Sequence, residues 1–566
     1  MSRPVKRILM IYPRFPKNFW GMHYSLPMIG KKTSIPPLGL ITIAALTPPC
    51  YEMRLINMNF QTVTDEDLAW ADLFCFSAIL IQKESLFEAA QRCRRDGGGK
   101  PIVFGGPYPT SCPEECGPYC DSLVLDEGEM TWPAFLKDLE EDRCRKIYRA
   151  AEKPDITQTP VPRFDLLNVA DYLSMSIQFS RGCPFLCEFC DITVLFGRRP
   201  RTKTPEQMIR ELEALYKTGY RGFVFMVDDN FIGNKKEVKK FLPVLRDWNK
   251  ARGYPFYYGT EASVNLSDDR ELLRGMVESL FVWVYVGLES PSEDSLRETK
   301  KLQNIGGSLV DRVKIIQNTG LIVWGGFVVG FDSDKEDIFD RQIEFIREAA
   351  IPIASVAVLY ALPGTPLHAR MKLENRLLFD EELMETGRVD MAAGNSRPEY
   401  TNIRTRIPRE EMINGYFRVM RDLYTPANYF DRALQTLCRQ PRPRSALEGA
   451  RKAVWLGGIL SKNFSMEKLP SGAVHRPSAA SKIGFFYQEC TKLPDEFKKA
   501  TRRFIWQVLR KCPYQAMWII PYVLMGIHYY RFTFEDLLPA GEAESLNRLH
   551  WDSQPRERAT ASFQRA

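Results

Sequence analysis

The sequence predicts an α/β protein in three parts: an N-terminal doubly wound, Rossmann-like domain, a (β/α)6 partial barrel and a mainly helical C-terminal domain. Three observations lead to this fold class. Apolar runs of strand type alternate with helical patterns over the first 150 residues. The alternation resumes at about residue 171, and beyond about residue 395 only helical patterns remain. The expected divisions are residues 1–150, a linker at 151–170, residues 171–395 and residues 396–566.

The first part contains five short apolar runs that we expect to be buried parallel strands. They cover residues 7–13, 51–59, 72–79, 101–107 and 121–129. A doubly wound sheet of this kind binds ligands outside the carboxyl ends of its strands. Residues 151–170 contain three prolines, which is typical of a linker.

The middle part contains six further candidate strands, with helical stretches such as 204–219 and 308–320 between them. The strands are expected at residues 174–180, 222–229, 255–262, 281–290, 321–331 and 352–362. Six βα units predict a barrel or partial barrel, whose chemistry lies at the carboxyl ends of the strands.

Composition limits the class of protein. A hydrophobic content of 45% and a charged content of 26% are typical of a soluble globular protein. Thirteen cysteines in a chain that starts without a secretory signal indicate reduced thiols, and therefore a cytoplasmic location. The net charge is +7, and residues 439–511 hold sixteen Lys or Arg against five Asp or Glu. This basic region has no recognisable RNA- or DNA-binding module, so we expect no nucleic-acid partner.

Three cysteines lie within eight positions in the stretch SRGCPFLCEFCDI, residues 180–192. A structural zinc site has four Cys or His ligands, and no histidine lies between His23 and His368. A four-iron cluster is normally held by four thiolates, so three cysteines leave one iron open to a non-protein ligand. Zinc binding, or three thiols buried as small apolar side chains, remain the alternatives.

The CxxxCxxC spacing after a first barrel strand, with Phe189 directly before the last cysteine, resembles the signature of radical S-adenosylmethionine enzymes. The resemblance implies that Cys183, Cys187 and Cys190 hold a [4Fe–4S] cluster and that Phe189 lies beside the adenine. In that family the open iron binds S-adenosylmethionine, and reductive cleavage yields a 5′-deoxyadenosyl radical. The family therefore abstracts hydrogen from carbon.

Other strand ends carry candidate contacts to S-adenosylmethionine. Asp228, Asp229 and Asn230 stand where the family commonly has Gly-Gly-Glu, and carboxylate or amide oxygens can still accept from its amino group. Glu261 and Glu289 end the next two strands and are candidates for the ribose hydroxyls or the amino group. Helix capping or ion pairing would explain both glutamates equally simply.

Gly326, in the fifth strand of this part, would let a ligand approach the backbone closely. Tight packing inside the barrel is the alternative explanation for this glycine.

The first domain, placed before such a barrel, resembles the cobalamin-binding class of these enzymes. The supporting stretches are IPPLGLITIAAL, VFGGPYPTSCPEE and DEGEMTW. The resemblance implies that cobalamin contacts come from strand ends and the following turns, at Ser77, Gly105, Gly106, Glu127 and Gly128. The domain lacks the Asp-x-His-x-x-Gly motif and has only His23, so we expect cobalt without a histidine ligand. A nucleotide-like fold without any ligand is the alternative.

Over roughly residues 5–430 the sequence is similar to hopanoid C-2 methylases and their relatives, which include methylases of bacteriochlorophyll side chains. The resemblance implies a cobalamin-dependent radical C-methyltransferase that acts on an unactivated carbon of a hydrophobic substrate, either hopanoid or lipid-like or a tetrapyrrole. One alternative is an enzyme of the same architecture that catalyses cyclisation or C–C bond formation without methyl transfer. A noncatalytic iron–sulfur or cobalamin-responsive regulator is the other.

The expected partners follow from this chemistry. The cluster needs an external reductant such as flavodoxin or ferredoxin, and a role in lipid biosynthesis would bring the protein to membranes. Residues 512–530 contain no Asp, Glu, Lys or Arg, although two prolines make them a poor membrane span. Peripheral contact with a membrane through this C-terminal region, or packing of the segment against the barrel, are the two interpretations.

Overall fold

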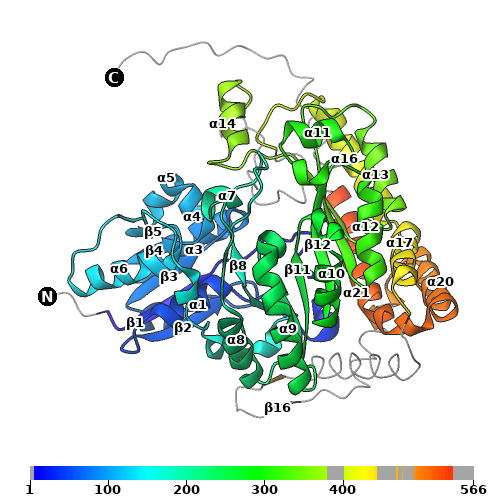
Figure 1. The fold of residues 1–566 in the computed structure, drawn as a ribbon. Coiled ribbons are helices and arrows are strands. Elements are labelled where there is room, and N and C mark those ends of the chain that lie inside the picture. The colour runs from blue at the N-terminus through cyan, green and yellow to red at the C-terminus, as the bar shows by residue number, and fades with distance from the viewer. Residues whose placement is uncertain are drawn as a thin grey trace.

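The computed structural model describes residues 5–378, 401–442, 488–489 and 491–539, and the backbone of two short strands, β15 (Glu467–Lys468) and β16 (Val474–His475). Two six-stranded sheets, each parallel throughout, form its framework, and helices pack on them (Figure 1). The predicted α/β fold class is therefore confirmed. The expected boundary between residues 395 and 396 lies outside the described residues.

The first sheet has the strand order β2-β1-β3-β4-β5-β6. Its strands are β1 (Arg7–Tyr12), β2 (Glu52–Asn57), β3 (Leu73–Ser77), β4 (Ile102–Gly105), β5 (Ser122–Val124) and β6 (Ile147–Tyr148). The helices are α1 (Leu38–Leu46), α2 (Asp65–Trp70), α3 (Lys83–Asp96), α4 (Pro107–Ser111), α5 (Pro113–Cys116) and α6 (Gly128–Glu140). Alternate residues of β1 and β3 enter two separate hydrophobic cores, one on each face of the sheet. All five predicted strands are present, and the two-residue β6 was not predicted.

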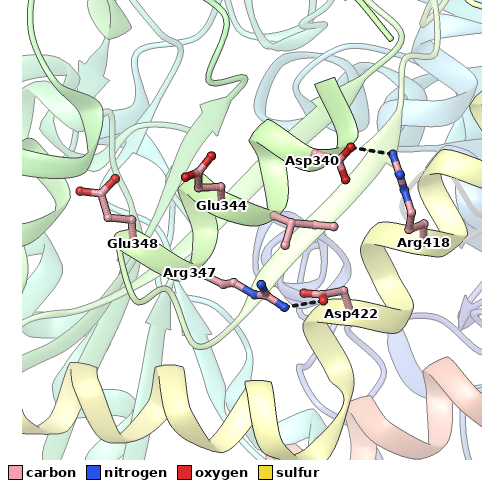
Figure 2. Close-up of a pocket in the computed structure, with 7 residues that line it drawn as sticks. Asp340, Glu344, Arg347, Glu348, Arg418 and Asp422 are labelled. Carbon is pink, nitrogen blue, oxygen red and sulfur yellow. Dashed lines mark hydrogen bonds and ion pairs between the residues drawn. The ribbon is translucent and has the colours of Figure 1, made fainter. Parts of the chain in front are cut away.

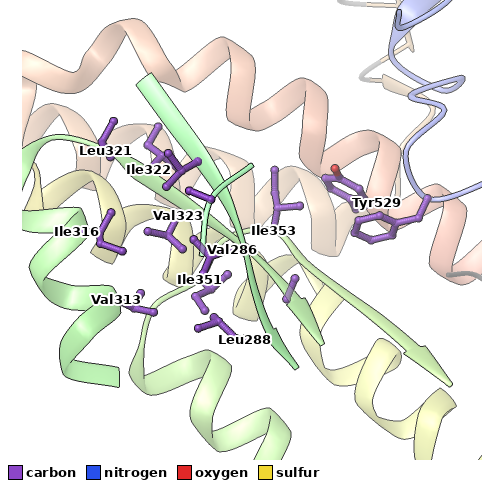
Figure 3. Packing of buried hydrophobic residues seen from close by; sticks show 14 of the residues in the cluster. Val286, Leu288, Val313, Ile316, Leu321, Ile322, Val323, Ile351, Ile353 and Tyr529 are labelled. Carbon is purple, nitrogen blue, oxygen red and sulfur yellow. The ribbon is translucent and has the colours of Figure 1, made fainter. Parts of the chain in front are cut away.

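The second sheet has the order β14-β13-β12-β11-β10-β7, and its two end strands are not paired with each other, so the barrel is partial. Its strands are β7 (Met175–Ile177), β10 (Gly222–Met226), β11 (Phe256–Glu261), β12 (Phe281–Glu289), β13 (Ile322–Val329) and β14 (Ala354–Val358). Its helices are α8 (Pro205–Lys217), α9 (Lys235–Ala251), α10 (Arg270–Glu278), α12 (Leu309–Thr319) and α13 (Ile338–Glu348). Figure 3 shows Val313 and Ile316 of α12 beside the apolar side chains of β12 and β13. All six predicted strands are confirmed.

Four C-terminal helices share the core of the barrel. They are α16 (Arg409–Tyr424), α17 (Pro426–Arg439), α20 (Asp495–Lys511) and α21 (Ile519–Arg531). Helix α14 (Pro366–Leu373) packs in a separate, smaller cluster. The Tyr424 hydroxyl donates to the Ala354 carbonyl at 2.8 Å, which ties α16 to β14. Residues of α21 such as Tyr522 and Tyr529 are buried in the same cluster. Among the described residues, no helix is long and apolar enough to cross a membrane.

A loop after β1 connects the two sheets. Phe19 is fully buried, with its ring centroid 4.5 Å from that of Tyr529 in α21. The neighbouring Trp20 contacts Tyr285 of β12, with ring centroids 5.5 Å apart. The loop therefore carries aromatic side chains of the first domain into the barrel and its C-terminal helices.

Candidate functional site

The loop that carries the three cysteines begins just after β7 and is fixed at its base by Asp228. The Asp228 carboxylate accepts hydrogen bonds from the Phe179 N–H at 3.1 Å and the Ser180 hydroxyl at 2.6 Å, and also from the Ser180 N–H. Burial raises the pKa of this carboxyl to about 6. Asp228 is the second residue beyond the end of β10, and its oxygens position the loop rather than point to an open space.

Gly182 and Asp229 continue this support. Gly182 has φ of 92°, and a Cβ atom there would lie 2.8 Å from the Gly197 carbonyl oxygen, so only glycine fits. The Gly182 N–H donates to Asp229 at 3.1 Å. Among the described residues, the other oxygen of Asp229 has no hydrogen-bond donor, so it is available to a ligand. Burial raises the pKa of Asp229 to about 7.

Side-chain amides lie next to two of the three cysteine sulfurs. The Asn230 Nδ2 is 3.8 Å from Cys183 Sγ, and the Gln303 Nε2 is 3.5 Å from Cys187 Sγ. Burial raises the pKa of the Cys183 and Cys190 thiols. Amide donors around three soft, partly buried thiols fit an iron–sulfur cluster, whose properties depend on hydrogen bonds to its sulfurs.

The three sulfurs are not arranged around one metal ion. Within the part of the chain that the structure describes, no three Cys, His, Asp or Glu side chains could hold a single ion. A closed structural zinc site has four such ligands, whereas in a cluster each thiolate binds its own iron.

Two carboxylates at neighbouring strand ends differ in their pairing. Glu289 is buried, adopts φ of 64° and accepts from Lys301 Nζ at 2.7 Å. Burial opposes the charge on Lys301, but the Glu289 carboxylate keeps the pKa of the amine above its usual value. Glu261 has no such cation in contact among the described residues, and burial, with the charges of Asp229 and Asp228, raises its pKa to about 8. Glu261 and Asp229 together form an acidic pair that a cationic ligand would stabilise.

The aromatic residue before the last cysteine lies in the same region. The Phe189 ring centroid is 5.9 Å from that of Phe331 and 5.9 Å from Lys301 Nζ. At Gly326, by contrast, a Cβ atom would lie 2.3 Å from the Tyr285 hydroxyl. The neighbouring side chain therefore fills the space over Gly326, as tight packing requires, and contact of this glycine with S-adenosylmethionine stays a prediction.

In the first domain, three of the expected cobalamin contacts lie together. Ser77 pairs with Gly105 across β3 and β4, at the carboxyl ends of both strands. Gly106 has φ of 95°, and a Cβ atom there would lie 2.6 Å from the Ser77 hydroxyl oxygen. These strand ends are next to the point where the strand order reverses, between β1 and β3, which is where doubly wound sheets bind ligands.

The other two expected contacts have different surroundings. A Cβ atom on Gly128 would lie 2.2 Å from Ile43 Cδ1, so this glycine lets α6 pack closely on α1. Glu127 accepts from Arg181 Nη1 at 2.8 Å and from Arg201 Nη2 at 2.7 Å. Its carboxylate is thus directed to the cysteine loop, and a contact with cobalamin stays a prediction.

Arg181 therefore connects the two parallel sheets. It lies between Ser180 and Gly182, and it also pairs with Glu129 at 2.8 Å. The sequence did not single out Arg181, Lys301 or Gln303 as functional. Arg181 was visible in the stretch SRGC, whereas nothing in the local sequence connects Lys301 and Gln303 to the cysteines more than a hundred residues earlier.

A groove elsewhere on the surface has a volume of about 520 Å³ and lies between α13 and α16. Figure 2 shows its two ion pairs, Asp340 with Arg418 and Arg347 with Asp422. Its lining contains none of the predicted site residues. The opposite charges within each pair neutralise each other, and Glu344 and Glu348 also line the groove.

Comparison with known proteins agrees with this arrangement. A family model described as the radical SAM superfamily matches residues 177–373, and one described as a domain of unknown function matches residues 365–536. An uncharacterized methyltransferase of Synechocystis sp. is 44% identical over 77% of this chain and 80% of its own length. The hopanoid C-2 methylase of Rhodopseudomonas palustris is 35% identical over 66% of this chain and 72% of its own length.

A solved structure with the same fold is the radical S-adenosylmethionine methyltransferase TsrM of Kitasatospora setae, with cobalamin and a [4Fe–4S] cluster bound. It superposes with a TM-score of 0.58 at 13% identity, over 86% of this chain and 99% of that one. The likeness shows that an N-terminal doubly wound domain followed by a partial barrel is an architecture that solved enzymes share.

Proposed function

The chain belongs to the cobalamin-dependent radical S-adenosylmethionine methyltransferases, and from that membership we propose that it methylates an unactivated carbon of a hopanoid-like substrate. The observation that carries the choice of substrate is the 35% identity with the hopanoid C-2 methylase over 72% of that protein. A tetrapyrrole is the second candidate substrate. A radical mechanism suits both, because acid–base groups cannot ionise an unactivated C–H bond near neutral pH.

The residues at the ends of the barrel strands fit the family's cofactors. Cys183, Cys187 and Cys190 would hold the cluster, and the Asn230 and Gln303 amides would donate to its sulfur ligands. When bound, the cluster and S-adenosylmethionine supply the radical chemistry, and cobalamin supplies the transferred methyl group. We propose that a flavodoxin or ferredoxin delivers the electron.

The charged side chains would orient S-adenosylmethionine. The free oxygen of Asp229 and the carboxylate of Glu261 can accept from the methionyl ammonium, which would replace their present mutual repulsion with attraction. Lys301, already held by Glu289, would present its remaining N–H groups to the methionyl carboxylate.

Cobalamin would bind at the carboxyl ends of β3 and β4, where Ser77, Gly105 and Gly106 lie together beside the point at which the strand order reverses. The only histidine in this domain is engaged elsewhere: His23 Nε2 lies 3.3 Å from Asp536 Oδ2, and its ring packs on His528. These contacts support a cobalt ion without a histidine ligand from this domain.

The inner face of the barrel supports an apolar, polycyclic substrate. Trp283 and Trp324 stack with ring centroids 4.2 Å apart, and both are only partly buried. Glu261 of β11 pairs with Tyr285 of β12, and Tyr285 pairs with Trp324 of β13, so Trp283 lies one strand and Trp324 two strands from Glu261. Flat apolar rings of this kind give a hydrophobic ligand a large contact area.

The proposal is tested with the reconstituted protein, a strong reductant, S-adenosylmethionine labelled in its methyl group, and a desmethyl hopanoid. Methyl transfer predicts a labelled hopanoid together with equal amounts of S-adenosylhomocysteine and 5′-deoxyadenosine. 5′-Deoxyadenosine without S-adenosylhomocysteine would support cyclisation or C–C bond formation instead. Labelled product from a tetrapyrrole alone would overturn the choice of substrate and keep the reaction.

A further inference from the structure

Helix α20 has two opposite faces of different chemistry. Phe497, Phe504 and Val508 are buried and pack against the C-terminal core. At about 100° per residue, a second set of side chains occupies an arc of roughly 120° on the other side of the helix. We refer to this set as the basic face, and it consists of Lys499, Arg502, Arg503, Trp506, Leu509 and Arg510. Asp495, in the first turn, lies on the same side and pairs with Lys498 at 3.3 Å.

Two large apolar side chains stand in the middle of the basic face. Trp506 is 57% exposed and Leu509 is 52% exposed, and they are three residues apart, so they are neighbours on the helix surface. The guanidinium carbon of Arg510 lies 5.1 Å from the Trp506 ring centroid. Single exposed apolar residues are common on soluble proteins, but two adjacent ones surrounded by cations form a surface with a defined chemistry.

The cations of the basic face are all exposed, and no carboxylate of the described residues forms an ion pair with them. Other surface helices of the same chain differ. On α10, Arg274 pairs with Glu278 at 2.7 Å, and on α9, Lys240 pairs with Glu237 at 2.8 Å. The basic face thus presents uncompensated positive charge. Figure 1 shows α20 at the outer edge of the molecule, on the side away from the first sheet.

We propose that the basic face docks the protein on the surface of an anionic lipid bilayer. Lys and Arg side chains are attracted to anionic headgroups, and Trp and Leu enter the boundary between headgroups and acyl chains. A nucleic acid would use the same four cations, but it offers no apolar layer for Leu509. This surface differs from residues 512–530, where α21 turns most of its apolar side chains into the core.

Docking on a bilayer would bring the enzyme to the membrane that contains a hopanoid-like substrate, and in this respect the inference rests on the proposed function. The binding itself requires neither cofactor nor turnover. Its failure and the failure of methyl transfer are therefore separate results.

The experiment is co-sedimentation of the full-length protein with vesicles of phosphatidylglycerol and phosphatidylcholine, and with vesicles of phosphatidylcholine alone. We expect the protein to bind the anionic vesicles at least about tenfold more tightly than vesicles of phosphatidylcholine alone. Binding to the anionic vesicles should fall steeply with added salt. Arg502→Gln/Arg503→Gln/Arg510→Gln should remove most of the binding, and Trp506→Ser/Leu509→Ser should weaken it at every salt concentration.

The chain offers matched controls on other surfaces. Leu373 in α14 is 85% exposed, and Leu373→Ser should leave binding unchanged, as should Arg274→Gln. Equal binding of the basic-face variants and the unaltered protein would overturn the proposal, and so would equal binding to both vesicle types. Binding of a single-stranded RNA oligonucleotide without any binding to vesicles would assign the same face to nucleic acid instead.

Discussion

Glu261 shows how burial prepares a single carboxyl for a cationic ligand. Burial raises its pKa to about 8, and Asp229 adds to the shift. Only the ionised carboxylate attracts an ammonium group. At neutral pH, Glu261 must therefore lose a proton when such a ligand binds.

This coupling predicts a pH dependence for S-adenosylmethionine. Its affinity should fall by about tenfold as the pH falls from about 7.5 to about 6.5, because Glu261 becomes protonated while the ligand's amino group keeps its charge. Equilibrium dialysis with the reconstituted protein measures the effect. Glu261→Gln should bind more weakly and show a shallower dependence, to which Asp229 still contributes, and an unchanged pH profile in the variant would contradict the assignment.

The Lys301–Glu289 pair makes a second prediction at the scale of residues. Both side chains are largely buried, so Lys301→Met leaves a buried carboxylate without its cation. The free energy of unfolding should fall by roughly 3 kcal/mol, measured by urea denaturation of the protein without its cluster. Lys314→Met, which breaks the exposed pair with Glu348, is the matched control and should cost less than about 1 kcal/mol. Similar losses in the two variants would show that Lys301 is not held in a buried pair.

At the scale of elements, the connection between α6 and the cysteine loop is the most consequential contact. Glu127 stands at the N-terminal end of α6, just beyond β5, and Glu129 lies in its first turn. Both pair with Arg181, whose backbone neighbours are fixed by Asp228 and Asp229. These ion pairs therefore connect the first domain to the cysteine loop.

Loss of this connection should uncouple the two half-reactions. Arg181→Gln should still cleave S-adenosylmethionine to 5′-deoxyadenosine, but the ratio of methylated product to 5′-deoxyadenosine should fall several-fold. The double variant Glu127→Gln/Glu129→Gln should lower this ratio as much as Arg181→Gln does. As a control, Glu114→Gln changes an exposed acid in α5 and should leave the ratio as it is in the unaltered protein. Equal losses of product and 5′-deoxyadenosine in the Arg181 variant would show a general loss of structure instead.

The elements themselves were largely predictable from the sequence. Buried parallel strands are continuous apolar runs, and this property located β1 to β5 and all six barrel strands. The two residues of β6 are too few to produce such a pattern. Residues 512–530 were ambiguous because an apolar segment looks the same whether it faces lipid or a protein core, and only the packing of α21 in the structure distinguishes the two.

At the scale of the whole molecule, the sequence displayed the cysteine motif but not the residues around it. The three proposed cluster ligands lie close together in the chain, so their spacing is visible. The side chains that support them come from distant elements, and a pair such as Lys301 and Glu289 acquires its meaning only when β12 and the following loop are folded. Similarly, the charge of residues 439–511 was evident, but its concentration on one face of α20 depends on which side of the helix is buried.

The whole architecture joins the sheet that we propose for cobalamin to a barrel in which the three proposed cluster cysteines follow β7. The loop containing Phe19 and Trp20 and the Arg181 ion pairs hold the two together. This arrangement suits an enzyme that must bring a methyl donor and a substrate radical to one place. Such an enzyme needs both the cluster and cobalamin in the same chain.

The most direct test of that requirement is the metal content of the protein after anaerobic reconstitution with iron, sulfide and cobalamin, followed by desalting. We predict about four irons and about one cobalt per chain. Cys183→Ser/Cys187→Ser/Cys190→Ser should lose the iron and retain the cobalt, because the two cofactors lie at different sheets. Four irons without cobalt in the unaltered protein would contradict the account and favour a radical enzyme that does not transfer methyl groups.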